Sequence, residues 1–380
     1  MRASRAAIAL LLIVPAHPLR AADSSAAPRA TELNNEGVAA ARAGRFEQGA
    51  ALLRQALQLD PADALAKKNL SGILTDWAVL VERAGDPAKP ETLLREALQR
   101  NPANGRAARL LGDFYYFQRS EFAQAIAAWT QAHAVLEGEE RRVVADRIAQ
   151  AQRDAAIERG FASQPTAHFD IRLPPGSGVD VRALGEWLEA RYAALAALLG
   201  QGPPMLTVII YTDADLHRTY YQRDWALGFY DGRLRLSAGE LQTELGPAMV
   251  AHELAHAFLH HLYGNTLPTW IHEGFASAQE EELRVRTDAE RRVDEAVRSG
   301  ASWVPLKWLD RRFEQPSNVE DVWKAYSEAR LVVAELIARH GRERFVTFLQ
   351  ALAHGTPMDA AFDAAFAPDR WAGTDRNFLR

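Results

Sequence analysis

Five of the eleven histidines fall within 21 residues, and two of them frame a segment that could hold a metal ion. Its core reads His252-Glu253-Leu254-Ala255-His256. If the segment is helical, four residues turn through roughly 400°, so both imidazoles lie on one face and can share an ion. Glu253 lies about 100° further round, beside the ion, where its carboxylate can take a proton from water. The spacing therefore predicts a zinc ion (Zn2+) bound by His252 and His256, with Glu253 as the general base.

A catalytic zinc usually has three protein ligands and an open position, so a third ligand is needed. The longer metzincin pattern requires glycine and histidine three and six residues after the second histidine, where this chain has Leu259 and Leu262. A glutamate from a following helix is the alternative. The next helical segment has Glu273 in its first turn, and Gly274 and Ala276 would let it approach the histidine helix closely. We expect Glu273 to be the third ligand.

These motifs together resemble those of a known enzyme class. HExxH followed about 17 residues later by Pro-x-Trp-x-x-Glu-Gly-x-Ala is similar to the gluzincin metallopeptidases. The resemblance is strongest to the peptidase-MA-like domain, which often accompanies tetratricopeptide repeats, and it covers roughly residues 165–370. It implies a thermolysin-like fold and the same zinc ligands and base.

The resemblance also suggests two further features of the site. In the family, a tyrosine or histidine beyond the third ligand stabilises the oxyanion, and Tyr326 is the best match. The alternative is that Tyr326 is an aromatic core residue of an amphipathic helix. The segment 232–237, just before the histidine helix, would pair with an extended peptide substrate as an edge strand does.

One position departs from the family pattern. Thermolysin-like enzymes have an aspartate four residues after the glutamate ligand, which orients the first histidine; this chain has Ser277. Such a carboxylate fixes the histidine tautomer and raises metal affinity. Metal binding or activity is therefore expected to be weaker, unless Glu280 or another acid substitutes.

The elements around these motifs indicate an α+β fold. Segments 166–173 and 232–239 alternate apolar and polar residues, as half-buried strands do, and 206–211 is a β-branched run suited to a central strand. The outward arginines of 232–239 would suit an edge strand. A helix is expected over 183–199, and helices follow the last strand to the end of the chain.

Residues 31–160 are alanine-rich and repeat themselves. Leu59-Asp60-Pro61 is echoed by Arg100-Asn101-Pro102, each after an amphipathic segment, which resembles the 34-residue tetratricopeptide repeat. Its motif places Gly37 and Ala56 at the small-residue positions of the first unit. A later unit has Gly112, Tyr115, Phe122 and Ala132 in similar order, with one residue inserted. The sequence predicts a helical solenoid whose concave face binds a protein partner, or else a plain helical bundle.

Composition limits the remaining possibilities. The chain has 380 residues, no cysteine and a formal charge of −5, so thiolate metal sites are excluded and nucleic-acid binding is disfavoured. Two arginines, the apolar run 6–16 and a small-residue pair predict a signal peptide over residues 1–22. No later stretch has the length and apolarity of a membrane span. We expect a periplasmic or secreted protein.

Two functions from different classes remain. The first is an exported zinc metallopeptidase that hydrolyses peptide bonds in a peptide or protein substrate. The second is an assembly or adaptor protein that uses its repeats and carries a degenerate peptidase domain. The intact histidines and glutamates favour the peptidase, because a scaffold has no need of a buried unpaired cluster. A third interpretation, a closed structural zinc site, is the least favoured, since such a site usually has four protein ligands.

Overall fold

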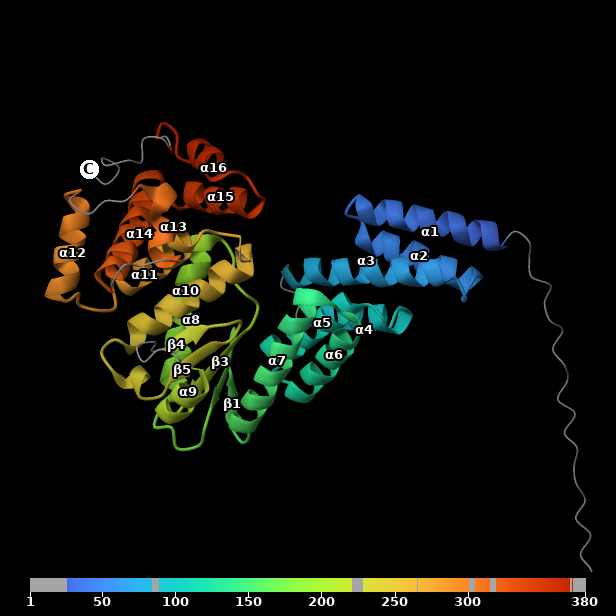
Figure 1. The fold of residues 1–380 in the computed structure, drawn as a ribbon, viewed down its shortest axis with the longest axis horizontal. Helices are drawn as coiled ribbons and strands as arrows, with labels where there is room; N and C mark the ends of the chain where they lie inside the picture. The colour runs from blue at the N-terminus through green and yellow to red at the C-terminus, as the bar shows by residue number, and fades with distance from the viewer. Residues whose placement is uncertain are drawn as a thin grey trace, which may run out of the picture. The chain divides into compact units, whose positions relative to one another are not determined.

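The computed structural model describes residues 26–83, 89–220, 228–264, 266–300, 305–314, 319–369 and 371. The chain divides into two compact units, Met1–Leu74 and Thr75–Arg380 (Figure 1). The expected signal peptide lies outside the described residues. Among the helices that are described, none combines the length and the apolar character needed to cross a membrane.

The first unit contains a helical hairpin. It is formed by α1 (Ala26–Arg42) and α2 (Phe46–Leu59), and α3 (Ala64–Arg83) begins in the same unit. A Cβ on Gly37 would lie 2.9 Å from the carbonyl oxygen of Gly49 on α2. Ala56 is buried in the same unit. Gly37 thus stands where α1 and α2 pack closely and Ala56 is in the core, while the assignment to the repeat family stays a prediction.

The second unit begins with helices. They are α4 (Lys89–Arg100), α5 (Gly105–Asp113), the π-helical turn η1 (Phe114–Gln118), α6 (Phe122–Val135) and α7 (Gly138–Ile157). Trp129 on α6 leaves no room for a Cβ on Gly112. The π turn begins two residues after Gly112, within the segment that the sequence predicts to be a later repeat unit with one inserted residue. A π turn is how a helix accommodates such an insertion.

A five-stranded mixed sheet follows. Its strands are β1 (Ala162–Pro165), β2 (Phe169–Leu173), β3 (Leu206–Tyr211), β4 (Gly228–Tyr230) and β5 (Leu234–Ser237), in the order β1-β2-β3-β5-β4. The three inner strands are parallel, and β1 and β4 are antiparallel at the two ends. A mixed sheet in a largely helical chain confirms the α+β class. The sequence did not indicate β1 or β4, each of which is short.

One face of the sheet carries the main core. It packs against α8 (Val181–Leu199) and α10 (Gly246–Tyr263). Ile171, Val208 and Leu236 point from three strands into one cluster with Leu188 of α8 and Leu254 of α10, all of them fully buried. This core fixes α10, and therefore both histidines, against the sheet.

The other face is covered by the preceding helices, which corrects the expected edge strand. β5 lies between β3 and β4, and its Arg235 and the preceding Arg233 are fully buried. Arg233 donates to both carboxylate oxygens of Glu158, and Arg235 lies 2.9 Å from Asp154 of α7. Alternation of arginines with apolar residues does not distinguish a solvent face from a face covered by carboxylates. The terminal strand on this side is β4.

The remaining helices include α9 (Asp213–Tyr220), η2 (Glu240–Gln242), α11 (Thr269–Glu280), α12 (Asp288–Arg298), η3 (Leu306–Trp308), α13 (Leu309–Glu314), α14 (Val319–His340), α15 (Arg342–Ala353) and α16 (Met358–Ala365). Of these, α11, η2 and α15 contact α10. α11 packs against both α10 and α14. Gly274 faces α14, where the carbonyl oxygen of Ala329 leaves no room for a Cβ. The sequence predicts that Gly274 lets α11 approach the histidine helix, but the close approach at this residue is to α14 instead.

Candidate metal centre

α10 presents its histidines as the spacing predicts. The helix begins after Leu245, has Pro247 in its first turn and ends at Gly264, whose φ of 64° suits glycine. His252 and His256 lie one turn apart, with their Nε2 atoms 3.0 Å from each other. α11 brings Glu273 opposite them, and its first turn is held by Asp310, which accepts from the Trp270 N–H.

Three side chains meet at one point. Glu273 Oε2 lies 3.4 Å from Nε2 of His252 and 3.6 Å from Nε2 of His256. Ligand atoms at zinc distances in a tetrahedral site lie about 3.3–3.6 Å from one another. Both glutamate–histidine distances fit this range, and the 3.0 Å between the two Nε2 atoms is slightly shorter. Among the described residues, these three are the group whose ligand atoms are close enough to share a metal.

The electrostatics of this group also fit a cation. Glu273 Oε2 is buried, and no described residue donates a well-formed hydrogen bond to it. Burial raises the pKa of Glu273, but the neighbouring imidazoles outweigh burial and hold the pKa well below its usual value. Burial lowers the pKa of His252, and the contacts with Glu273, Glu280 and Glu253 reverse this and raise it to about 10. A site that retains a proton this strongly favours a positive charge at its centre.

Glu253 lies beside the group rather than in it. Its carboxylate accepts a hydrogen bond from the backbone of Tyr230, at the end of the terminal strand β4. Burial raises its pKa, and the positive charges of His252 and His256 oppose this. A carboxylate with a raised pKa, next to a cation site, is suited to accept a proton and return it.

Tyr326 of α14 faces the same point. Its ring centroid lies 6.5 Å from that of His252, and Phe313 packs edge-on against it at 5.2 Å. Burial, together with the charge of Glu273, raises the pKa of Tyr326, so the phenol keeps its proton as a donor. The aromatic ring is thus both packed and directed at the site.

Glu280 supplies a contact that the sequence left open. Its Oε1 lies 2.7 Å from Nδ1 of His252, the ring nitrogen that faces away from Glu273. Glu273 and Glu280 are seven residues apart on α11, two turns along the same face. Glu280 therefore orients the first histidine, in the role that an aspartate at position 277 would otherwise have.

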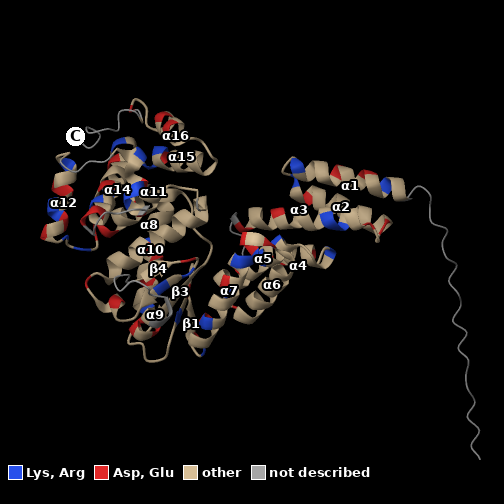
Figure 2. Ribbon diagram, in the orientation of Figure 1, with Lys and Arg blue, Asp and Glu red and all other residues tan. Residues whose placement is uncertain are grey.

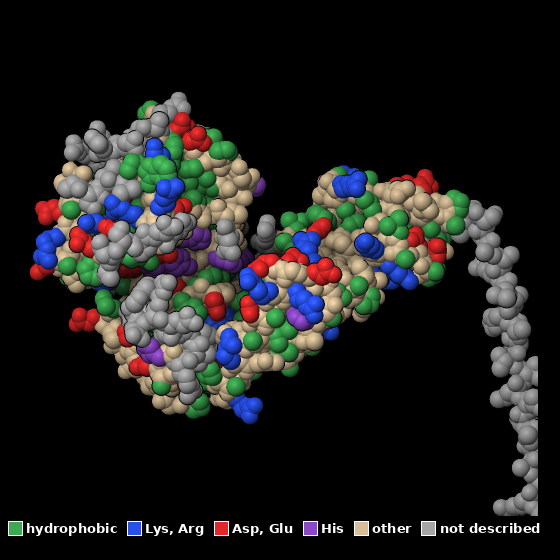
Figure 3. Space-filling view, in the orientation of Figure 1, with side chains coloured by type: hydrophobic (Ala, Val, Ile, Leu, Met, Phe, Trp, Pro, Cys, Tyr) green, Lys and Arg blue, Asp and Glu red, His purple; other side chains and the backbone are tan. Residues whose placement is uncertain are grey.

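The other histidines lie around this centre. The His272 ring is 6.0 Å from that of His256, and burial, followed by the charge of His256, lowers its pKa to about 4. His260 packs edge-on against Tyr230 at 5.7 Å, and burial lowers its pKa. Figure 3 shows histidine side chains gathered in a hollow on one face of the second unit.

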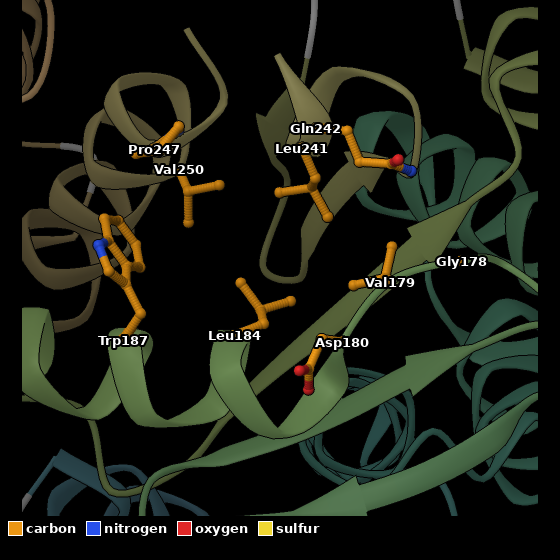
Figure 4. Close-up of a pocket in the computed structure, with 9 residues that line it drawn as sticks. All are labelled: Gly178, Val179, Asp180, Leu184, Trp187, Leu241, Gln242, Pro247 and Val250. Atoms are coloured by element: carbon orange, nitrogen blue, oxygen red, sulfur yellow. The ribbon is translucent and has the colours of Figure 1, made fainter. Parts of the chain in front are cut away.

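A separate cavity of about 220 Å³ lies on the far side of α10. Pro247 and Val250 line it from α10, and Leu184 and Trp187 line it from α8 (Figure 4). Around the helix axis, these α10 residues face roughly the opposite way from His252 and His256. The cavity lies outside the cluster of histidines and glutamates.

Comparison with known proteins identifies the part of the chain that carries this centre. Residues 195–378 match the family model described as Peptidase MA superfamily. The match supports a gluzincin-like peptidase-MA domain. It includes α10, α11 and α14, and therefore the histidines, the three glutamates of the site and Tyr326. No curated protein matches the chain. The resemblance to the peptidase-MA domain is thereby supported, whereas the tetratricopeptide repeats stay a prediction.

Proposed function

We propose that the protein is an exported zinc metallopeptidase. His252, His256 and Glu273 are the zinc ligands, and Glu253 is the general base. The observation that carries this proposal is the meeting of Glu273 Oε2 with two histidine Nε2 atoms at 3.4 and 3.6 Å. The match to a peptidase superfamily over the same residues supports it and implies a peptide or protein substrate.

Zinc held at this point would polarise the scissile carbonyl and make a water molecule more acidic. Glu253 takes a proton from the attacking water and returns it to the leaving amine. Its hydrogen bond from Tyr230 and its burial hold the carboxylate in place between these steps. Tyr326 donates its hydroxyl proton in a hydrogen bond to the developing oxyanion.

The terminal strand β4 supplies a place for an extended substrate. Its last residue, Tyr230, contacts Glu253 through its backbone, so this edge of the sheet lies next to the base. A peptide that adds to β4 as a further strand would pass its backbone in front of Glu253. β4 replaces the segment 232–237 in this role, because that segment is internal to the sheet.

The proposal is tested by measuring bound zinc and peptide cleavage in three variants of the full chain. Glu253→Gln should keep zinc and lose cleavage, and Glu273→Ala should lose both. Tyr326→Phe should keep zinc and lower kcat about 10²-fold or more, since it removes a donor used in the transition state. Zinc binding without cleavage across a broad peptide library would favour the adaptor function. An absence of zinc in the wild-type protein would contradict the metallopeptidase.

A further inference from the structure

α12 is held to the rest of the domain mainly by charged groups. Of its eleven residues, only Val297 is buried. Figure 2 shows that acidic and basic residues occupy much of this helix. Apolar burial therefore contributes little to its position, and its ion pairs must fix it against its neighbours.

The N-terminus of α12 is closed by a capping box. The Thr287 hydroxyl accepts from the Glu290 N–H at 3.2 Å, and Glu290 Oε2 accepts from the Thr287 N–H at 2.7 Å. This arrangement satisfies two backbone donors at the helix start. It uses only one of the two carboxylate oxygens of Glu290.

The second oxygen of Glu290 leads back to the metal centre. Glu290 Oε1 lies 2.8 Å from Nη1 of Arg284, and Nε of the same guanidinium lies 2.9 Å from Oε2 of Glu280. Glu280 then uses its other oxygen, Oε1, for the 2.7 Å contact with His252. Glu280 and Arg284 each use different atoms for their two neighbours, so the three contacts can form at the same time.

These side chains are mostly shielded from water. The exposed fractions are 15% for Glu280, 18% for Arg284 and 25% for Glu290. Charge-assisted hydrogen bonds in such surroundings are stronger and better directed than those of exposed pairs. Arg284 thus holds the Glu280 carboxylate from the side opposite to His252, and Glu290 holds Arg284.

A second point on α12, one turn beyond Glu290, is fixed to the helix that carries Tyr326. Asp294 Oδ2 lies 2.6 Å from Nη2 of Arg330 on α14, and Ser327 of α14 donates to the same carboxylate. Because α12 is also held at Asp294, Glu290 is not free to follow Arg284 away from Glu280. α12 therefore provides a fixed point for the chain of contacts that ends at His252.

We propose that Arg284 and Glu290 are positioning residues for the zinc ligand His252, acting through Glu280. This inference rests on the proposed function, since it takes His252 as a ligand of zinc. Removing the charge of Glu290 releases Arg284, which weakens the hold on Glu280 and lets the His252 ring leave its ligand orientation. Outer partners of metal ligands change metal affinity by about 10–100-fold, and groups further out along this series of contacts should change it by roughly 3–10-fold.

The test measures the zinc affinity of the metal-free full chain by competition with a chromogenic chelator. Glu290→Gln keeps an oxygen for the capping box but loses the charge that holds Arg284, and it should bind zinc roughly 3–10-fold more weakly. Thr287→Ala is the matched control, because it breaks the cap and keeps the ion pair with Arg284. It should lower the temperature of unfolding and leave zinc affinity within about twofold of wild type.

A double-mutant cycle separates positioning from general loosening of the fold. In the Glu280→Gln background, Glu290→Gln should cause no further loss of zinc affinity, since its route to His252 is already broken. An unchanged zinc affinity of Glu290→Gln, or an equal loss with and without Glu280, would overturn the inference. If wild type binds no zinc at all, the proposed function itself fails, and these two failures are distinguishable.

Discussion

Nδ1 of His252 lies 2.7 Å from Oε1 of Glu280, two helical turns beyond the third candidate ligand on α11. This contact explains how the centre can be complete although Ser277 stands where a thermolysin-like enzyme has aspartate. The longer glutamate side chain, placed seven residues after Glu273 instead of four, reaches the same ring nitrogen.

Glu280→Gln should weaken zinc binding by about 10–100-fold, because an amide holds the imidazole less firmly and does not raise its basicity. Glu282→Gln is a suitable control, since Glu282 is exposed and close in sequence. Chelator competition measures both variants. Equal zinc affinities for the two variants would show that Glu280 does not orient His252.

Arg235→Met should lower the free energy of unfolding by about 3–5 kcal/mol, because it leaves the buried carboxylate of Asp154 with too little positive charge. The side chains of Arg235 and Asp154 are both fully buried, and Nη2 of Arg235 lies 2.9 Å from Oδ2 of Asp154. Arg182→Gln removes one member of an exposed pair with Glu186 and should cost roughly 0–1 kcal/mol. Urea titrations measure the unfolding free energy of both variants. Similar losses of unfolding free energy would mean that the buried ion pair contributes no more than the exposed one.

Gly274→Ala should destabilise the domain by about 1–3 kcal/mol, since its Cβ would press on the Ala329 carbonyl and force α11 away from α14. Gly72→Ala is the comparison, because a Cβ there meets nothing within 4 Å. The measurement is the denaturation midpoint of the metal-free protein. A Gly274→Ala protein as stable as wild type would show that the two helices can separate without cost.

Acid should weaken the fold partly through Glu189. Burial raises the pKa of this carboxyl, but hydrogen bonds from His168 and Thr166 outweigh burial and lower it. A pKa below the unfolded value of about 4.3 gives stability that is complete above about pH 5 and is lost as pH falls through the folded value. Unfolding free energies of wild type and Glu189→Gln between pH 3 and 7 test this. The unfolding free energy of Glu189→Gln should fall less steeply with decreasing pH than that of wild type. Parallel curves for the two proteins would show that Glu189 does not contribute to the acid sensitivity.

The sequence was sufficient for the parts of the site that depend on local periodicity. Two histidines four residues apart on one helix, and a glutamate in the first turn of the next, needed no knowledge of distant contacts. The position of Glu280 also follows from the period of α11, and the sequence analysis names it as an acid that could replace the aspartate absent at Ser277.

The sequence was insufficient where distant residues decide the environment. Arg233 and Arg235 alternate with apolar residues as on a solvent face, but Asp154 and Glu158, about 80 residues earlier, cover them. Strand β4 has only three residues, too few for alternation to be visible. The same short strand brings Tyr230 to Glu253, so its omission also hid the contact that holds the base.

The central claim is that a single zinc ion, held by His252, His256 and Glu273, is needed for peptide cleavage. The most direct measurement removes metal from the full chain with a chelator and then titrates zinc back while cleavage of a peptide library is followed. We predict that cleavage disappears on removal and returns fully at one zinc per chain, whereas Glu273→Ala regains none. Cleavage that persists in metal-free protein, or that returns equally in Glu273→Ala, would contradict this account.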